Sequence, residues 1–173
     1  MGIATIREAK PEDVAALHAI NAAGQPGVAP LTAHEASAIA ARATRCWVAE
    51  ESGGVRGYLI AYTASDVYDG EEFAWFQQRF AAFLYIDQIA VSPESRHSGV
   101  GSQLYQVAGE YARAHGLSVL TCEVNVEPPN PISLRFHRAL GFQEVGVLHT
   151  LDGRTVALVR LDVTTSPGAA ATS

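Results

Sequence analysis

The sequence predicts one α/β domain built on a mixed β-sheet with helices against it. Its 173 residues fit a single domain with a sizeable core. Strand-like and helix-like segments follow the order strand, two helices, three strands, helix, strand, helix and two strands, which is typical of such a sheet. We place the domain at residues 1–163. Residues 164–173 lack large apolar side chains, so we expect a disordered tail.

The first third of the chain contains a short strand, two helices and a hairpin. Residues 4–8 have strand composition, and Pro11 then suits the first position of a helix. Thr32 and Glu35 have the spacing of a capping box, which predicts a second helix over residues 32–43. Strands at 46–50 and 55–63 flank a glycine-rich turn, so we expect them to pair as a hairpin.

Residues 65–82 are mixed, with aromatic side chains among acidic ones. We interpret this segment as a helix or a lid. Phe76 and Phe80 are four residues apart, which suits either a buried helix face or a wall of an acceptor site.

The rest of the chain has the clearest elements. Residues 83–91 are the strongest strand, and the helix that follows carries a full apolar stripe before a Gly116 end signal. A strand at 118–126 and a short helix at 131–140 come next. The last two strands, 142–149 and 155–163, meet at the turn Asp152-Gly153.

Composition excludes several classes of protein. A net charge of −6 without a basic run argues against nucleic-acid binding. No apolar stretch is long enough for a membrane span, and the start of the chain does not resemble a signal peptide. Cys46 and Cys122 form no metal-binding spacing, so we expect no metal site and two buried free thiols in the reducing cytoplasm.

A phosphate-binding loop is predicted between the strong strand and the apolar-striped helix. The segment reads Arg96-His-Ser-Gly-Val-Gly101. A helix start presents unpaired N–H groups and the positive end of the dipole, and glycine lets a ligand approach the backbone. Arg96 adds a charged donor suited to phosphate. The pattern is neither the dinucleotide nor the nucleoside-triphosphate glycine motif.

This loop resembles the signature of the GNAT superfamily of N-acetyltransferases, Gln/Arg-x-x-Gly-x-Gly/Ala after the fourth strand. Arg96, Gly99 and Gly101 match every fixed position. The segment from Asn130 to Phe142 resembles the second signature, an Asn, a short helix and a closing Gly-Phe. The resemblance covers nearly the whole chain and implies a GNAT-like fold with a mostly antiparallel sheet.

The resemblance implies acetyl-CoA as co-substrate and assigns cofactor contacts. The backbone of residues 89–91 would hold the pantetheine arm, the loop and the helix start the pyrophosphate, and the second signature the rest of the cofactor. The cofactor-binding candidates are Ile89, Ala90, Val91, Arg96, His97, Ser98, Gly99, Val100, Gly101, Ser102, Asn130, Ser133 and His137. Many relatives are dimers, which makes a homodimer a further expectation.

The short helix has one polar face. Asn130 can cap it, and Asn130, Ser133 and His137 share one side at about 100° per residue. Many members of the family have Tyr where this chain has His137, and that Tyr can protonate the leaving thiolate. His137 is therefore either a general acid or a packing residue.

Two carboxylates inside strands are candidates for the base that deprotonates the acceptor amine. Glu123 and Asp87 each lie in an apolar run, where an acidic side chain is costly unless it is paired or used. We favour Glu123 as the base and Asp87 as an acceptor anchor or alternative base; a structural ion pair with Arg would explain either. Tyr85 and Asn125 are expected in the same cleft.

Three functions remain open at this point. The first is an acetyl-CoA-dependent N-acetyltransferase that acts on the primary amine of a small molecule. The second has a protein or peptide amine as acceptor. The third is a CoA-binding module without turnover, which the histidine at position 137 keeps open.

Overall fold

The computed structural model describes residues 3–163, and the predicted tail lies outside this range. The sheet has the strand order β1-β2-β3-β4-β5-β7-β6, and all neighbours are antiparallel except β4 and β5. This confirms the predicted mixed α/β fold. The strands are β1 (Thr5–Glu8), β2 (Arg45–Glu51), β3 (Gly54–Thr63), β4 (Phe83–Val91), β5 (Val119–Glu127), β6 (Gln143–His149) and β7 (Thr155–Asp162).

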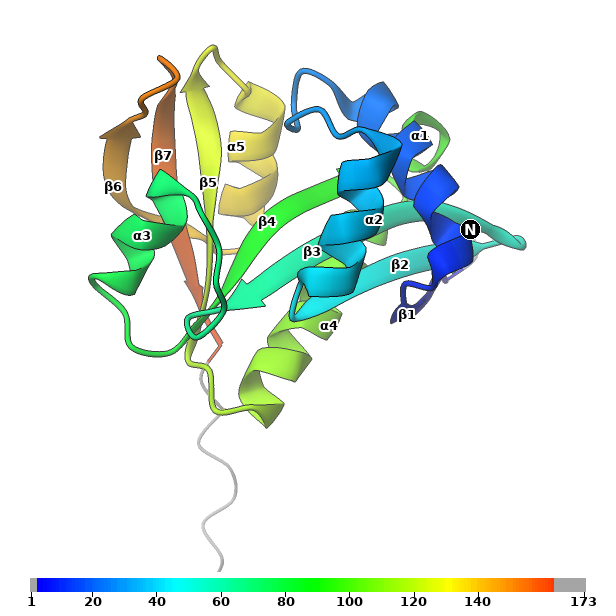
Figure 1. Ribbon diagram of the computed structural model, residues 1–173, viewed down its shortest axis with the longest axis horizontal. Coiled ribbons are helices and arrows are strands. Elements are labelled where there is room, and N and C mark those ends of the chain that lie inside the picture. Colours follow the sequence, from blue (N-terminus) through cyan, green and yellow to red (C-terminus); the bar gives the residue numbers. More distant parts are fainter. Residues whose placement is uncertain (1–2, 164–173) are drawn as a thin grey trace, which may run out of the picture.

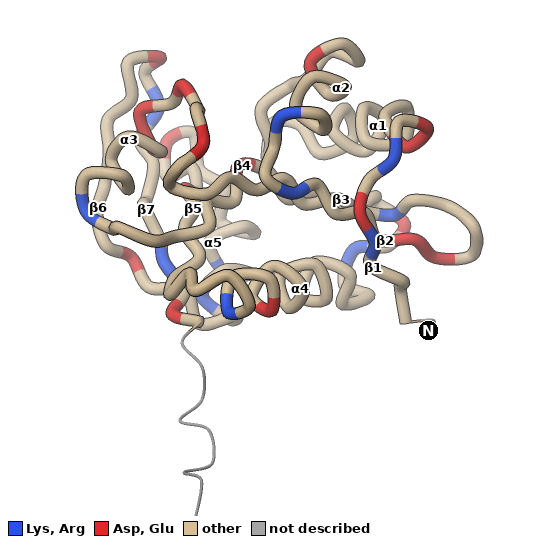
Figure 2. The backbone as a smooth tube through the Cα atoms, turned by 60° about the horizontal axis from the view of Figure 1, so that its bottom comes forward, with Lys and Arg blue, Asp and Glu red and all other residues tan. Residues whose placement is uncertain are grey.

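Helices cover both faces of the sheet (Figures 1 and 2). In Figure 2, α1 and α2 lie on one side of the sheet and α4 lies on the other. The helices are α1 (Val14–Gly24), α2 (Ala33–Arg42), α3 (Glu71–Gln77), α4 (Val100–Ala114) and α5 (Pro131–Ala139), with 3-10 turns at Pro11–Asp13 and Pro93–Ser95.

Each face of the sheet has its own apolar core. Leu104, Ala108 and Ala112 of α4 recur every four residues and are fully buried, so the predicted stripe is the face that α4 packs on the sheet. On the other face, Leu17 of α1 and Phe73 of α3 are buried in the second core. Burial of such stripes supplies the main favourable term for this layered arrangement.

Most predicted ends agree with the structure to within one or two residues. The capping box that starts α2 is present, with the Thr32 hydroxyl accepting from the Glu35 amide and the Glu35 carboxylate accepting from the Thr32 amide. The helix expected at Pro11 begins as a 3-10 turn, because Asp13 accepts from the Lys10 amide and pairs with Arg7. Both cysteines are buried and free, as predicted.

The mixed segment 65–82 contains only the seven-residue helix α3. Phe76 is fully buried, which fits the interpretation as core, and Phe80 packs partly buried against the same core. The loop before α3 and its first turn place Tyr68 and Glu72 on the wall of a cavity. The phenylalanines of this segment therefore pack in the core, while Tyr68 and Glu72 line the cavity.

Candidate active site

The sheet opens between its two parallel strands. β4 and β5 pair only over Phe83–Tyr85 and Val119–Thr121. Among the described residues, no pair joins these strands beyond that point, and Figure 1 shows them diverging. A cavity of about 610 Å³ lies at this opening and includes side chains from both strands and from α5. The edge of β4 that faces the opening consequently has no strand partner from Ile86 onward.

A β-bulge at Asp87 turns β4 at the mouth of this opening. Ala61 of β3 pairs with Ile86 and Ile60 pairs with Gln88, so Asp87 is the extra residue. Gln88 is buried and accepts hydrogen bonds from the Tyr58 hydroxyl at 2.9 Å and the Asn21 amide at 3.1 Å. The bulge thus fixes Gln88 while Asp87 lines the cavity.

Two tyrosine–carboxylate pairs stand side by side in the cavity wall. The Tyr85 hydroxyl donates to Glu123 Oε2 at 2.7 Å, and the Tyr68 hydroxyl donates to Asp87 Oδ1 at 2.5 Å. The rings of Tyr68 and Tyr85 contact each other with centroids 5.5 Å apart. The structure therefore brings together the two predicted carboxylates and the predicted Tyr85, although they come from different strands.

Both carboxylates have raised pKa values. Burial is the main cause for Glu123, the negative charge of Glu72 adds to it, and the pKa rises to about 8 even though the Tyr85 hydrogen bond lowers it. Burial likewise raises the pKa of Asp87, against the effect of the Tyr68 hydrogen bond. A group with a pKa near 8 can exchange protons at physiological pH, as a general base must.

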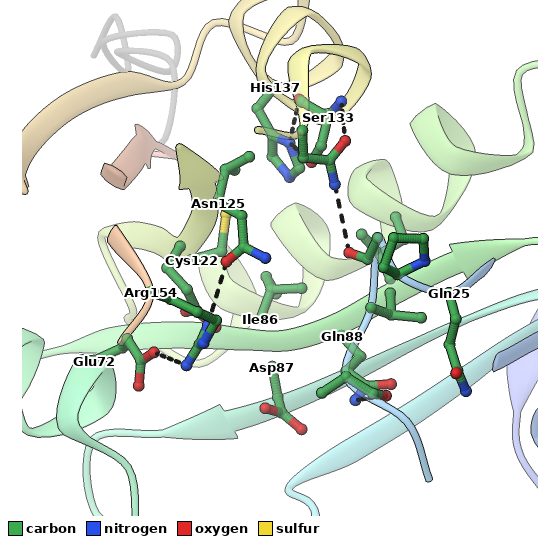
Figure 3. A pocket seen from close by; sticks show the side chains of 18 of the residues that line it. Gln25, Glu72, Ile86, Asp87, Gln88, Cys122, Asn125, Ser133, His137 and Arg154 are labelled. Carbon is green, nitrogen blue, oxygen red and sulfur yellow. Dashed lines mark hydrogen bonds and ion pairs between the residues drawn. The ribbon is translucent and has the colours of Figure 1, made fainter. Parts of the chain in front are cut away.

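Arg154 lines the cavity and is held by three partners, of which Figure 3 labels Glu72 and Asn125. It donates to Glu72 Oε1 at 3.0 Å, to Asp152 Oδ2 at 2.8 Å and to Asn125 Oδ1 at 3.3 Å. The structural ion pair with Arg that we considered for Glu123 or Asp87 is instead made by Glu72 and Asp152.

His137 lies at the cavity wall on α5 with both ring nitrogens engaged. Its Nδ1 is 2.8 Å from the Ser133 carbonyl, which can only accept, so Nδ1 carries a proton. In the neutral ring, Nε2 therefore accepts from the Tyr105 hydroxyl at 2.8 Å. Burial lowers the pKa of His137 and favours this neutral form. The Tyr105 hydroxyl also lies 3.9 Å from Cys122 Sγ in the same wall.

The second signature contributes to the cavity wall. Asn130 accepts from the Ser133 amide at 3.2 Å and so caps α5. Its Nδ2 donates to the carbonyl of Gly27, 3.5 Å away in the loop after α1. Of the predicted cofactor contacts, the cavity includes Ile89, Asn130, Ser133 and His137.

The predicted phosphate loop lies at the start of α4, outside the residues that line this cavity. Gly99 is the residue before the helix and has φ 89°, a left-handed conformation that glycine adopts without strain. A Cβ added at Gly101 would come within 2.9 Å of the Phe136 ring, so the first turn of α4 packs closely on α5. Arg96 donates to the Ala23 carbonyl at 3.2 Å. The loop thus connects the N-terminus of α4 with α1 and α5.

Several residues of the site could not be found from the sequence. The cavity also includes Tyr68, Glu72, Tyr105, Asp152, Arg154 and the loop 25–30. Tyr105 follows Leu104 in the helix with the apolar stripe, and it belongs to no sequence motif. Arg154 follows a turn, and only the antiparallel pairing of β7 with β5 brings it to Asn125. No local pattern signals any of them.

The matching family model identifies the chain. The model of the acetyltransferase (GNAT) family covers residues 14–142. The chain belongs to the GNAT acetyltransferase family. Among curated proteins, none matches.

Solved structures agree with this GNAT assignment at the level of the fold. Ard1 from Thermoplasma volcanium has a TM-score of 0.75 and 19% identity, over 93% of this chain and 98% of that one. An N-acetyltransferase from Staphylococcus aureus has a TM-score of 0.69 and 25% identity, over 94% and 99%. A phosphinothricin acetyltransferase from Sinorhizobium meliloti, in complex with AcCoA, has a TM-score of 0.70 and 23% identity, over 99% and 94%.

The GNAT family uses acetyl-CoA. Among the described residues, no helix has the length and apolar character that crossing a membrane requires. Within residues 3–163, no group of three or more His, Cys, Asp or Glu side chains is arranged to hold a metal ion.

Proposed function

We propose that this chain is an acetyl-CoA-dependent N-acetyltransferase that transfers the acetyl group directly to the primary amine of a small molecule. One observation carries the proposal: Glu123, with a pKa of about 8, lines the cavity at the point where β4 and β5 separate. An alkylammonium ion has a pKa near 10, so the acceptor must lose a proton before its nitrogen can attack.

The residues present fit CoA in two places. The unpaired edge of β4, from Ile89 to Val91, offers backbone groups to the amides of a pantetheine arm, much as a strand would pair there. The first amides of α4 have no preceding turn to pair with, and the left-handed Gly99 leaves the backbone open to a pyrophosphate. Asn130 and Ser133 would contact the cofactor from α5.

Acetyl-CoA supplies the thioester: the acceptor nitrogen forms a bond to its acyl carbon while the C–S bond breaks, giving an amide and the CoA thiol. Glu123 takes the proton of the ammonium ion. A backbone N–H of β4 near Ile89 stabilises negative charge on the acyl oxygen. The nitrogen loses a second proton as the amide forms. The Tyr105 hydroxyl, positioned by its hydrogen bond to His137, passes a proton to sulfur and recovers this second proton from the nitrogen. Holding both reactants in one cleft contributes much of the acceleration.

Two further expectations belong to this proposal. Two buried free thiols suit a reducing compartment, which supports a cytoplasmic enzyme. A homodimer stays a prediction from the family resemblance.

The decisive experiment is release of CoA thiol from acetyl-CoA in the presence of a panel of small amines and peptides, with the acetylated product identified by mass spectrometry. Small amines should be acetylated with saturation kinetics. Acetylation of peptides alone would move the acceptor to the protein class. CoA binding without transfer to any amine would leave a binding module.

A further inference from the structure

The charged side chains of the cavity point to the chemical class of the acceptor. Carboxylates predominate there, and Arg154 is the one Lys or Arg among the described residues that line it. The acidic side chains are Glu72, Asp87, Glu123 and Asp152. This inference rests on the proposed function, because it concerns the amine that the cavity accepts.

Arg154 is not a free anion receptor. Its Nε is bonded to Asp152, one Nη to Glu72 and the other to Asn125, so each of its nitrogens already has an acceptor within the protein. Two carboxylates on one guanidinium leave the group with net negative charge. A ligand carboxylate could use only the remaining N–H of an Nη, and there it would lie close to Glu72 or Asp152, which like charges oppose.

Asp87 and Glu123 differ from the Arg154 group because neither pairs with a cation. Each accepts a side-chain hydrogen bond, from Tyr68 and Tyr85 respectively, and within residues 3–163 no Lys or Arg side chain pairs with either. A carboxylate removed from water is costly unless a positive charge or several donors stabilise it. Both groups line the cavity, so a cationic ligand can reach both.

The two carboxylates are also separate anchors. Glu123 lies on β5 and Asp87 on the bulge of β4, beyond the point where these strands stop pairing. Figure 3 shows Asp87 between Gln88 and the Glu72–Arg154 pair. The contacting rings of Tyr68 and Tyr85 connect the two anchors, and the partly exposed ring of Tyr68 offers an apolar surface on which an alkyl chain can pack.

We propose that the acceptor is an aliphatic diamine or polyamine, whose reacting nitrogen meets Glu123 while a second cationic nitrogen binds Asp87. An amine with one charge would leave Asp87 without a partner. An amino acid would bring its carboxylate into a cavity where, among the described lining residues, the one Lys or Arg side chain is already paired with two carboxylates.

The test compares three acceptors of equal chain length at saturating acetyl-CoA: cadaverine, pentylamine and δ-aminovalerate. Cadaverine has the second cation, pentylamine lacks it, and δ-aminovalerate replaces it with an anion. We expect kcat/KM for cadaverine to exceed that for pentylamine by about tenfold, the usual scale of one charge-assisted hydrogen bond. δ-Aminovalerate should be the poorest. Equal values for cadaverine and pentylamine, or a preference for δ-aminovalerate, would overturn the proposal.

Asp87→Asn should lower the ratio of cadaverine to pentylamine efficiency toward one. Glu144→Gln removes an exposed carboxylate of β6 outside this cavity and should leave the ratio unchanged. If Asp87→Asn fails to fold, the comparison of the three acceptors with the wild-type protein still tests the proposal. An unchanged ratio in folded Asp87→Asn would count against Asp87 as the anchor.

Calorimetry with the CoA-loaded protein separates this proposal from the proposed function. Cadaverine that binds without being acetylated would overturn the transferase reaction and leave only diamine binding to Asp87 and Glu123. Acetylation of pentylamine as fast as cadaverine would support the transferase reaction and contradict the preference for a diamine. Absence of cadaverine binding together with absence of turnover would remove both.

Discussion

The Tyr85 hydroxyl donates a 2.7 Å hydrogen bond to Glu123 across the last pair of residues that joins β4 to β5. Tyr85 pairs with Thr121, and Glu123 lies two residues further along β5, where the strands have separated. Glu123, the candidate base, is therefore hydrogen-bonded to a residue in the paired part of the sheet. Its own side chain lines the cavity where the strands have separated. Its protonation should determine the pH dependence of the enzyme.

Glu123→Gln tests the base. The reaction needs ionised Glu123 and a protonated acceptor, so wild-type kcat/KM should rise with pH up to about 8, level off, and fall above the acceptor pKa near 10. Glu123→Gln should lose about 10²–10⁴-fold at the plateau. Its activity should instead rise with free amine up to about pH 10. Initial rates of thiol release from pH 6 to 11 measure both profiles, and an unchanged profile would remove Glu123 from the role.

Tyr85→Phe should move the lower limb of this profile to higher pH. The Tyr85 hydrogen bond lowers the pKa of Glu123, so its loss raises the pH at which Glu123 ionises and reduces the rate at pH 7. Tyr68→Phe is the matched control, because Tyr68 bonds to Asp87 instead. A limb that moves equally in both variants would contradict the assignment.

The free energy of unfolding should also report the pKa of Glu123. In the folded protein Glu123 keeps its proton up to about pH 8, whereas its ordinary value is 4.5. The folded state therefore binds more protons between these values, and stability falls as pH rises through this window. Glu123→Gln has no carboxyl group that titrates at this position, so it should not lose this stability as the pH rises. Its Tm should exceed that of wild type by at least about 3 °C at pH 9 and not at pH 4, as measured by calorimetry.

Gly99→Ala should weaken CoA binding, with Gly116→Ala as control. Both glycines have left-handed backbones, with φ 89° and 69°, and lie at opposite ends of α4. Each substitution strains the backbone by about 1–3 kcal/mol. Only relaxation of the strain at Gly99 disturbs the proposed pyrophosphate site, so only Gly99→Ala should raise the Kd of CoA, by about tenfold. Equal Kd values in calorimetry would place the cofactor elsewhere.

His137→Gln and Tyr105→Phe should each lower kcat at saturating acetyl-CoA by about 10²-fold. Tyr105→Phe removes the hydroxyl that passes a proton to sulfur, and His137→Gln removes the imidazole that positions this hydroxyl. The Kd of CoA should change little in Tyr105→Phe. Full turnover in both variants would leave His137 as a packing residue.

The order of elements and both GNAT signatures could be read from the sequence because each depends on local patterns. The α4 stripe, the α5 cap at Asn130 and the turn at Gly153 are short-range features, and the structure contains all three. The carboxylates Asp87 and Glu123 were also visible, since an acid inside an apolar strand is unusual.

The partners of these carboxylates were decided only by the tertiary structure. Tyr68 reaches Asp87 from a loop, Arg154 pairs with Glu72 from the turn before β7, and Tyr105 reaches His137 from another helix. The physical reason is that side-chain charge and hydrogen bonding depend on which elements the sheet brings side by side. Local sequence determines where a strand or helix forms, whereas the separation of β4 from β5, and with it the cavity, arises from the packing of the whole domain.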